Sequence, residues 1–261
     1  MPLSKELMEN PEGKYLLFAT HLGLIKKTRL EEYVRINKNG KYALRFKLEG
    51  DKLVNVRSGT DDSDIVMISS SGFASRFACS NIRASGRVSA GVWGIKTGNR
   101  KGADGGHVVS MIATDDYDTQ ILTITRNGMA KRSRLGTSEK IASLDMEGNH
   151  KTDNNTGDLM FKTDGYRKTR PGAKGVYTMH VDDKDAIISA THIPDLRDNI
   201  FLLTKKGMMI RLSASQTKES KGKKSKGTRI MELRNSTKSG FKDSIIFTAR
   251  LPAELIDSEE E

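Results

Sequence analysis

A repeated sequence unit constrains the fold of this chain more than any other feature. The unit is an apolar run, a turn glycine and a second short run with a basic residue four positions after the glycine. It occurs four times, with the glycines at Gly23, Gly72, Gly128 and Gly207. Glycine supplies the positive φ that a tight hairpin turn needs, so each copy is predicted to form two antiparallel strands.

A second unit follows each copy and consists of a glycine, an apolar segment, a polar turn and another apolar segment. These units begin at Gly40, Gly91, Gly175 and Gly227. Two hairpins per repeat give four strands in about 50 residues, which is one blade of a propeller. We therefore predict an all-β fold, a propeller-like disc of at least four four-stranded blades, with a helical turn at Glu31–Asn37.

The spacing of the turn glycines sets the predicted boundaries. The spacings are 49, 56 and 79 residues, and the longest one contains a segment rich in Asn, Asp, Thr and Gly that we interpret as a loop-like insertion. The predicted organisation is an N-terminal extension at 1–13, a disc at 14–252 with blades at about 14–60, 61–115, 116–193 and 194–252, an insertion at about 136–165, and an acidic tail at 253–261.

The charge favours a polyanionic partner. The chain has 44 Lys and Arg against 33 Asp and Glu, a formal net charge of +11, and such a balance favours nucleic acid, an anionic membrane surface or an acidic protein. Strand alternation predicts that the basic residue after each turn glycine points outward. These four residues are Lys27, Arg76, Arg132 and Arg211.

The sequence shows no motif of catalysis or metal binding. The single cysteine, Cys79, excludes an intramolecular disulfide framework and a cysteine-rich zinc site. The segment Gly222–Ser225 lacks the glycine that a phosphate-binding loop needs at Thr217, and Asp153–Asp158 lacks the downstream glutamate of a calcium loop. Trp93 is interpreted as a core residue rather than as a base-stacking platform.

Two further observations concern localisation. No apolar run approaches the roughly 18 residues of a membrane span, and residues 1–13 lack the apolar core of an export signal. We therefore expect a cytoplasmic protein that is not attached to a membrane.

Several segments resemble a known family. Phe18–Leu30, Phe-Ala-Thr-His-Leu-Gly-Leu-Ile-Lys-Lys-Thr-Arg-Leu, is similar to a blade motif of the C-terminal domain of DNA gyrase A and of the corresponding domain of topoisomerase IV. Leu48–Val54, Gly86–Lys96, Ile121–Ser133 and Lys174–Val176 continue the resemblance in the family's order. It extends from about Gly13 to Pro252.

The resemblance implies a fold and a function. The fold is a β-pinwheel, a disc of four-stranded blades whose strands are exchanged between neighbours. The function is binding of duplex DNA without sequence specificity along a basic rim, with bending or wrapping, as an accessory domain of a type IIA topoisomerase. The resemblance also implies a nucleoid-associated domain, a monomer when isolated, whose partners are double-stranded DNA, a catalytic core and an ATPase subunit.

By the same resemblance, the chain alone is not an enzyme. The catalytic tyrosine and the ATPase site belong to other parts of the parent enzyme, so no cofactor is expected in this chain, and ATP and magnesium are expected only in the rest of that enzyme. The candidate DNA-binding residues are Lys26, Lys27, Arg29, Arg76, Lys131, Arg132, Arg134, Arg167, Lys168, Arg170, Lys174, Arg211, Lys218, Lys221, Lys223, Lys224 and Lys226.

Three alternatives stay open. The family's first-blade box, Gln-Arg-Arg-Gly-Gly-Lys-Gly, has only partial counterparts at Thr169–Gly175 and Gln216–Gly227, so the first alternative is a topoisomerase IV-type domain that binds DNA without full wrapping. The second is a propeller-like protein-interaction scaffold. The third is an enzyme that uses the glycine-rich segment Thr97–Gly106 or the insertion as a lid.

Overall fold

The structure is a computed structural model of the chain, and it describes residues 5–35, 38–97, 106–220, 222–233 and 243–257. In this part, helix is confined to α1 (Lys5–Glu9), α2 (Glu31–Val34) and α3 (Glu254–Asp257) and two 3₁₀ turns. Helix α2 confirms the helical turn that the sequence predicts. No helix among the described residues is long and apolar enough to cross a membrane.

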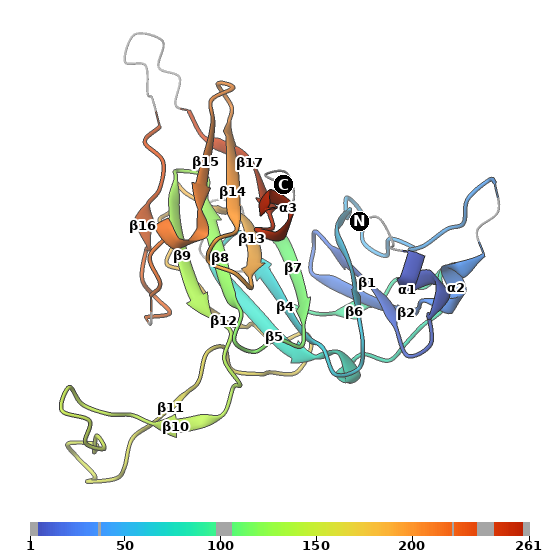
Figure 1. The fold of residues 1–261 in the computed structure, drawn as a ribbon. Coiled ribbons are helices and arrows are strands. Elements are labelled where there is room, and N and C mark those ends of the chain that lie inside the picture. The colour runs from blue at the N-terminus through green and yellow to red at the C-terminus, as the bar shows by residue number, and fades with distance from the viewer. Residues whose placement is uncertain (1–4, 36–37, 98–105, 221, 234–242, 258–261) are drawn as a thin grey trace.

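Antiparallel strands form four successive sheets, which confirms the all-β prediction (Figure 1). The first sheet has the order β3 (Leu53–Gly59), β1 (Tyr15–Thr20), β2 (Leu24–Arg29) and β6 (Val92–Trp93). The second has the order β12 (Val176–Tyr177), β5 (Phe73–Ala78), β4 (Asp64–Ser69) and β7 (Val108–Thr114). The third has the order β13 (Ile187–Ile193), β8 (Gln120–Thr125), β9 (Met129–Arg134) and β16 (Thr228–Arg229). The fourth has the order β15 (Met209–Ser213), β14 (Asn199–Thr204) and β17 (Ile245–Leu251).

Each of the first three sheets takes its outer strand from the following repeat. β6 pairs with β2, β12 with β5, and β16 with β9, so consecutive blades are tied together by exchanged strands. The sequence predicts an equivalent strand at Gly40–Phe46, but these residues form no strand. They belong to the first of the four repeats, whereas the strands that are exchanged come from the second, third and fourth repeats.

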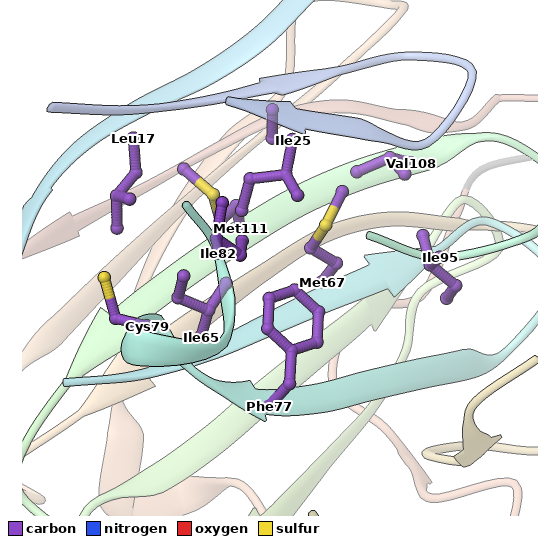
Figure 2. Packing of buried hydrophobic residues seen from close by; sticks show 11 residues of the cluster. Leu17, Ile25, Ile65, Met67, Phe77, Cys79, Ile82, Ile95, Val108 and Met111 are labelled. Carbon is purple, nitrogen blue, oxygen red and sulfur yellow. The ribbon is translucent and has the colours of Figure 1, made fainter. Parts of the chain in front are cut away.

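The cores lie between consecutive sheets. Figure 2 shows Leu17 and Ile25 of the first sheet facing Ile65, Met67 and Phe77 of the second, all fully buried. Comparable clusters join the second sheet to the third and the third to the fourth. A sheet inside the stack is therefore covered on both faces, and all six residues of β4 are buried.

The insertion differs from the loop that its composition predicts. It contains a separate two-stranded sheet, β10 (Lys140–Ala142) paired with β11 (Phe161–Thr163). This hairpin projects away from the four sheets, at the lower left of Figure 1.

Candidate nucleic-acid interface

Three crossover segments lead to and include the exchanged strands, at residues 82–96, 166–180 and 217–229, and we call them the crossover belt. They contain thirteen Lys and Arg residues and one acidic residue, Glu219, a formal charge of +12. The whole chain carries +11, so the residues outside the belt sum to −1. The excess positive charge of the protein is therefore concentrated in these three segments.

Hydrogen bonds join the three segments into one band. The amide of Gly172 donates to the carbonyl of Gly94 at 3.0 Å, and the amide of Lys96 donates to the carbonyl of Ala173 at 3.3 Å, which links the first two segments. The amide of His180 donates to the carbonyl of Ser225 at 3.1 Å, which links the second to the third. The cations of neighbouring blades thus follow a continuous path.

Most of the predicted basic residues in these segments are exposed. Arg167, Lys168, Arg170, Lys174, Lys218, Lys224 and Lys226 are exposed, and Lys223 is half-buried. Desolvation, and secondarily the nearby Arg167, lowers the pKa of Lys223. The structure therefore brings the predicted clusters at 167–174 and 218–226 close together, since Arg167 lies near enough to Lys223 to affect its pKa. The predicted Lys221 lies outside the described residues.

The prediction that the basic residue after each turn glycine points outward is wrong for three of the four blades. Lys27, Arg76 and Arg132 are buried, as are the predicted contacts Lys26 and Lys131 that precede two of them. They lie on β2, β5 and β9, which have strands on both sides. Their faces are covered by neighbouring sheets, by crossover segments or, at Lys26, by the segment that contains Ala43. These five residues have no surface for a phosphate, so they are removed from the candidate interface.

The buried cations hold the backbone of the crossover segments and of the turns beside them. Lys131 Nζ donates to the carbonyls of Thr178 and Gly222 at 2.7 Å and of Lys223 at 3.1 Å. Lys26 Nζ binds the carbonyls of Ala43 and Arg87 in the same way. Desolvation lowers the pKa of both ammonium groups from 10.5 to about 8.

The guanidinium of Arg76 is fully buried, like the ammonium group of Lys131. Its Nε and Nη2 donate to Asp64 Oδ2 at 2.9 and 2.6 Å, and its Nη1 donates to the carbonyls of Leu135, Gly136 and Tyr166 at 2.7–2.9 Å. Arg76 therefore ties its own blade to the third repeat and to the start of the second crossover segment.

Lys27 and Arg132 play comparable roles in the first and third sheets. Lys27 Nζ pairs with Asp61 and donates to the carbonyl of Cys79 at 3.2 Å. Arg132 Nε donates to the carbonyl of Thr217 at 2.8 Å, where the third crossover segment begins.

The remaining predicted residues lie at the ends of strands. Arg29 is exposed and lines a hollow with Arg83 of the first crossover segment, and Arg134 is exposed and lines another with Lys223 of the third. Both extend the belt. Arg211 is exposed on β15 and donates to Asn199 Oδ1 at 2.8 Å, and no crossover segment lies on the outer side of β15 in the described part.

Some exposed residues of the belt were not among the predicted DNA-binding residues. Arg83, Lys96 and Arg229 are exposed cations in the belt. Trp93 is 42% exposed and Tyr177 is 37% exposed, so the interpretation of Trp93 as a core residue is wrong. Trp93, Tyr177 and Arg229 each stand two positions after the glycine of the second unit, and that shared offset is the signal that could have found them.

Two kinds of reactive group were sought among the described residues, a metal-binding cluster and an activated thiol. No group of three or more His, Cys, Asp or Glu side chains among them could hold a metal ion. Burial raises the pKa of the Cys79 thiol, which disfavours the reactive thiolate.

Comparisons with known proteins agree with this architecture. The family model described as the DNA gyrase C-terminal domain, β-propeller, matches residues 14–58, 63–115, 119–137, 159–194 and 198–247. The DNA gyrase A protein of Staphylococcus epidermidis is 29% identical over 85% of this chain and 21% of its own length. The DNA gyrase A protein of Metamycoplasma arthritidis is 30% identical over 92% of this chain and 22% of its own length. The chain thus spans about a fifth of the length of these relatives.

Solved structures show the same fold at low identity. The C-terminal domain of DNA topoisomerase IV matches with a TM-score of 0.70 and 21% identity, over 96% of this chain and 68% of that chain. The DNA gyrase A C-terminal domain matches with a TM-score of 0.65 and 19% identity, over 94% and 68%. Together with the family match over most of the residues, these findings show that the chain belongs to the family of DNA gyrase C-terminal β-propeller domains.

Proposed function

We propose that this chain binds duplex DNA along the crossover belt, without sequence preference, and bends it as the accessory domain of a type IIA topoisomerase. The observation that carries the proposal is the concentration of a +12 formal charge in three segments that hydrogen bonds join into one band. Lys and Arg side chains neutralise phosphates and release condensed counterions, which supplies sequence-independent affinity.

The mechanism follows from the arrangement of the belt. A row of cations from successive blades meets successive phosphates only if the duplex curves along the row. Bending 20–30 base pairs costs on the order of 1–6 kcal/mol, which several phosphate contacts offset. Phosphate contacts position a protein but carry no base information, so we expect preference for flexible sequences rather than for a motif.

The proposal also assigns the chemical steps of the topoisomerase to parts of the enzyme outside this domain. Strand cleavage, ATP hydrolysis and the magnesium they use are assigned to a catalytic core and an ATPase subunit, which would be this domain's partners in the cytoplasm, at the nucleoid. The blade boundaries at 14–60, 61–115, 116–193 and 194–252 are retained as part of this proposal.

A salt titration of DNA affinity tests the proposal. If 6–10 phosphates are engaged, affinity for a random duplex should fall about 10³–10⁵-fold between 50 and 200 mM salt. The variant Arg170→Ala/Lys174→Ala/Lys224→Ala should weaken binding to all sequences and reduce the salt slope by about 0.9 for each phosphate that is no longer neutralised. A flat salt response would refute the proposal.

A control variant separates the belt from charge in general. Lys47→Ala/Lys52→Ala removes exposed cations outside the belt and should change affinity much less per charge. Trp93 gives an independent readout because it is the only tryptophan and lies on the belt. Bound DNA should shield it from acrylamide quenching, and unchanged quenching in the saturated complex would place the DNA elsewhere.

A further inference from the structure

The insertion forms an arm, residues 137–165, that lies outside the pattern of the four sheets (Figure 1). The match to the family model stops at residue 137 and resumes at residue 159. Most of the arm is thus additional to what the family shares, and neither the blades nor the belt explains it.

The arm has a rigid base beside the belt. The amide of Tyr166 donates to the carbonyl of Leu135 at 2.8 Å, and Arg76 binds the carbonyls on both sides of this closure. The amide of Lys168, an exposed belt residue, donates to Ser138 Oγ at 2.7 Å. The arm therefore leaves the domain at a fixed place, next to the proposed path of the DNA.

The tip of the arm has an ordered backbone of its own. The amide of Lys151 donates to the carbonyl of Ser143 at 2.7 Å, and the amide of Met160 donates to the carbonyl of Lys151 at 2.8 Å. The Asp145 carboxylate accepts from the amides of Glu147 and Asn149 at 2.9 and 2.8 Å. These bonds hold three short stretches side by side, so the tip has a defined shape.

This ordered tip exposes apolar side chains instead of burying them. Met146 is fully exposed, Phe161 is 58% exposed and Leu159 is 56% exposed, and Leu144 and Met160 are exposed beside them. They lie on the three stretches that the backbone hydrogen bonds hold together, and exposed apolar groups gathered on one small element mark a candidate interaction site. Their burial against a partner would be favourable, because it removes apolar surface from water.

The charge of the arm identifies the class of partner. Residues 137–165 contain six Asp and Glu and three Lys, a formal charge of −3, next to a belt of +12. An acidic arm repels a duplex, so DNA is not its ligand. A protein that holds the same DNA beside the belt must itself present cations, and such a surface complements the arm.

We propose that the arm docks onto a cationic, apolar-lined surface of the topoisomerase's DNA-cleavage core. This inference rests on the proposed function, because it takes the core to be the protein that shares the bound DNA. The apolar tip supplies the buried contact, and the carboxylates around it steer the approach.

The test measures binding of the full chain to the purified cleavage core of the same organism's topoisomerase, by sedimentation or interferometry at 50 and 150 mM salt. Met146→Ser/Leu159→Ser/Phe161→Ser should weaken binding to the core at least tenfold, while the melting temperature and the affinity for DNA alone stay unchanged. Glu147→Gln/Asp158→Asn should weaken it mainly at low salt. Tyr42→Ser/Ile246→Ser, exposed apolar positions off the arm, is the matched control and should bind normally.

Four outcomes with the core or with the chain itself would overturn the inference. These are no binding to the core, equal binding by the arm variant and the wild type, loss of DNA affinity in the arm variant, or self-association that the arm variant abolishes. Binding to the ATPase subunit instead of the core would also reject the proposed occupant. Failure of the wild-type chain to bind DNA would count against the proposed function separately, because that affinity is measured without the core.

Discussion

Replacing Arg76 by alanine separates a buried anchor from a DNA-contacting residue. Arg76 is fully buried, and its guanidinium makes five hydrogen bonds, two to the buried carboxylate of Asp64 and three to backbone carbonyls. We expect Arg76→Ala to destabilise the fold strongly. Any loss of DNA binding should follow from the loss of structure.

The magnitude follows from the groups that alanine leaves unpaired. Removing one partner of a buried ion pair costs about 3–5 kcal/mol, and each buried carbonyl left without a donor adds about 1–3 kcal/mol. Lys168 Nζ lies 3.0 Å from Asp64 Oδ2 and retains part of the compensation. The Leu135 carbonyl keeps the Tyr166 amide as a donor, so only the carbonyls of Gly136 and Tyr166 lose theirs. The ion pair and these two carbonyls together give about 5–11 kcal/mol before the compensation by Lys168, which is comparable with the whole stability of many domains, about 5–15 kcal/mol.

Urea unfolding followed by circular dichroism measures this loss. Lys174→Ala, an exposed belt residue, is the matched control and should unfold at the wild-type midpoint while binding DNA more weakly. The reasoning is refuted if Arg76→Ala unfolds at the wild-type midpoint and loses affinity for DNA, because Arg76 would then act at the surface.

Three other measurements check separate parts of the structure. Gly165→Ala should lower the melting temperature far more than Gly157→Ala. Both glycines have positive φ, but a Cβ at Gly165 would overlap the carbonyl of Leu135, whereas a Cβ at Gly157 would meet no atom within 4 Å. Equal effects would contradict the closed base of the arm. Between its folded pKa of about 8 and the ordinary value of 10.5, Lys131 binds fewer protons in the folded state than in the unfolded state. The free energy of unfolding should therefore rise with pH in that range, and it should rise less in Lys131→Met. Identical slopes would show that Lys131 is not desolvated. Cys79 is buried, so a thiol reagent should react slowly with the native protein and rapidly in urea, and fast native reaction would contradict the core between the first two sheets.

The repeat was predictable because its signals are local. A turn glycine at Gly72 or Gly128 with apolar residues on both sides determines a hairpin within a dozen residues, and both glycines have positive φ in the structure. The exposed cluster of Arg167, Lys168, Arg170 and Lys174 was predictable for a similar reason, because four cations within eight residues with no acidic residue among them favour an exposed segment.

The direction of the basic residues in the strands was not predictable by the same reasoning. Alternation assigns one face of a strand to solvent, but the blades cover both faces of β5, so Arg76 is buried with its neighbours Ser75 and Phe77. The anchoring carbonyls lie 59 to 90 residues away in the chain. Trp93 is the opposite case: it was predicted to be buried but is exposed. Its position depends on the pairing of β6 with β2 of the preceding repeat, which a local pattern does not reveal.

The buried cations and the exposed cations depend on each other. If the segment at 217–229 were free to move, DNA binding would have to order it, at roughly 1–2 kcal/mol per residue, which over thirteen residues exceeds what its few phosphate contacts return. Lys131 and Arg132 remove most of that cost at the folding stage, because they bind the carbonyls of Thr217, Gly222 and Lys223 in the free protein. Under the proposed function, more of the interaction energy of a preordered row of cations is available to bend the duplex. The buried Lys131 and Arg132 would then support DNA binding without contacting DNA.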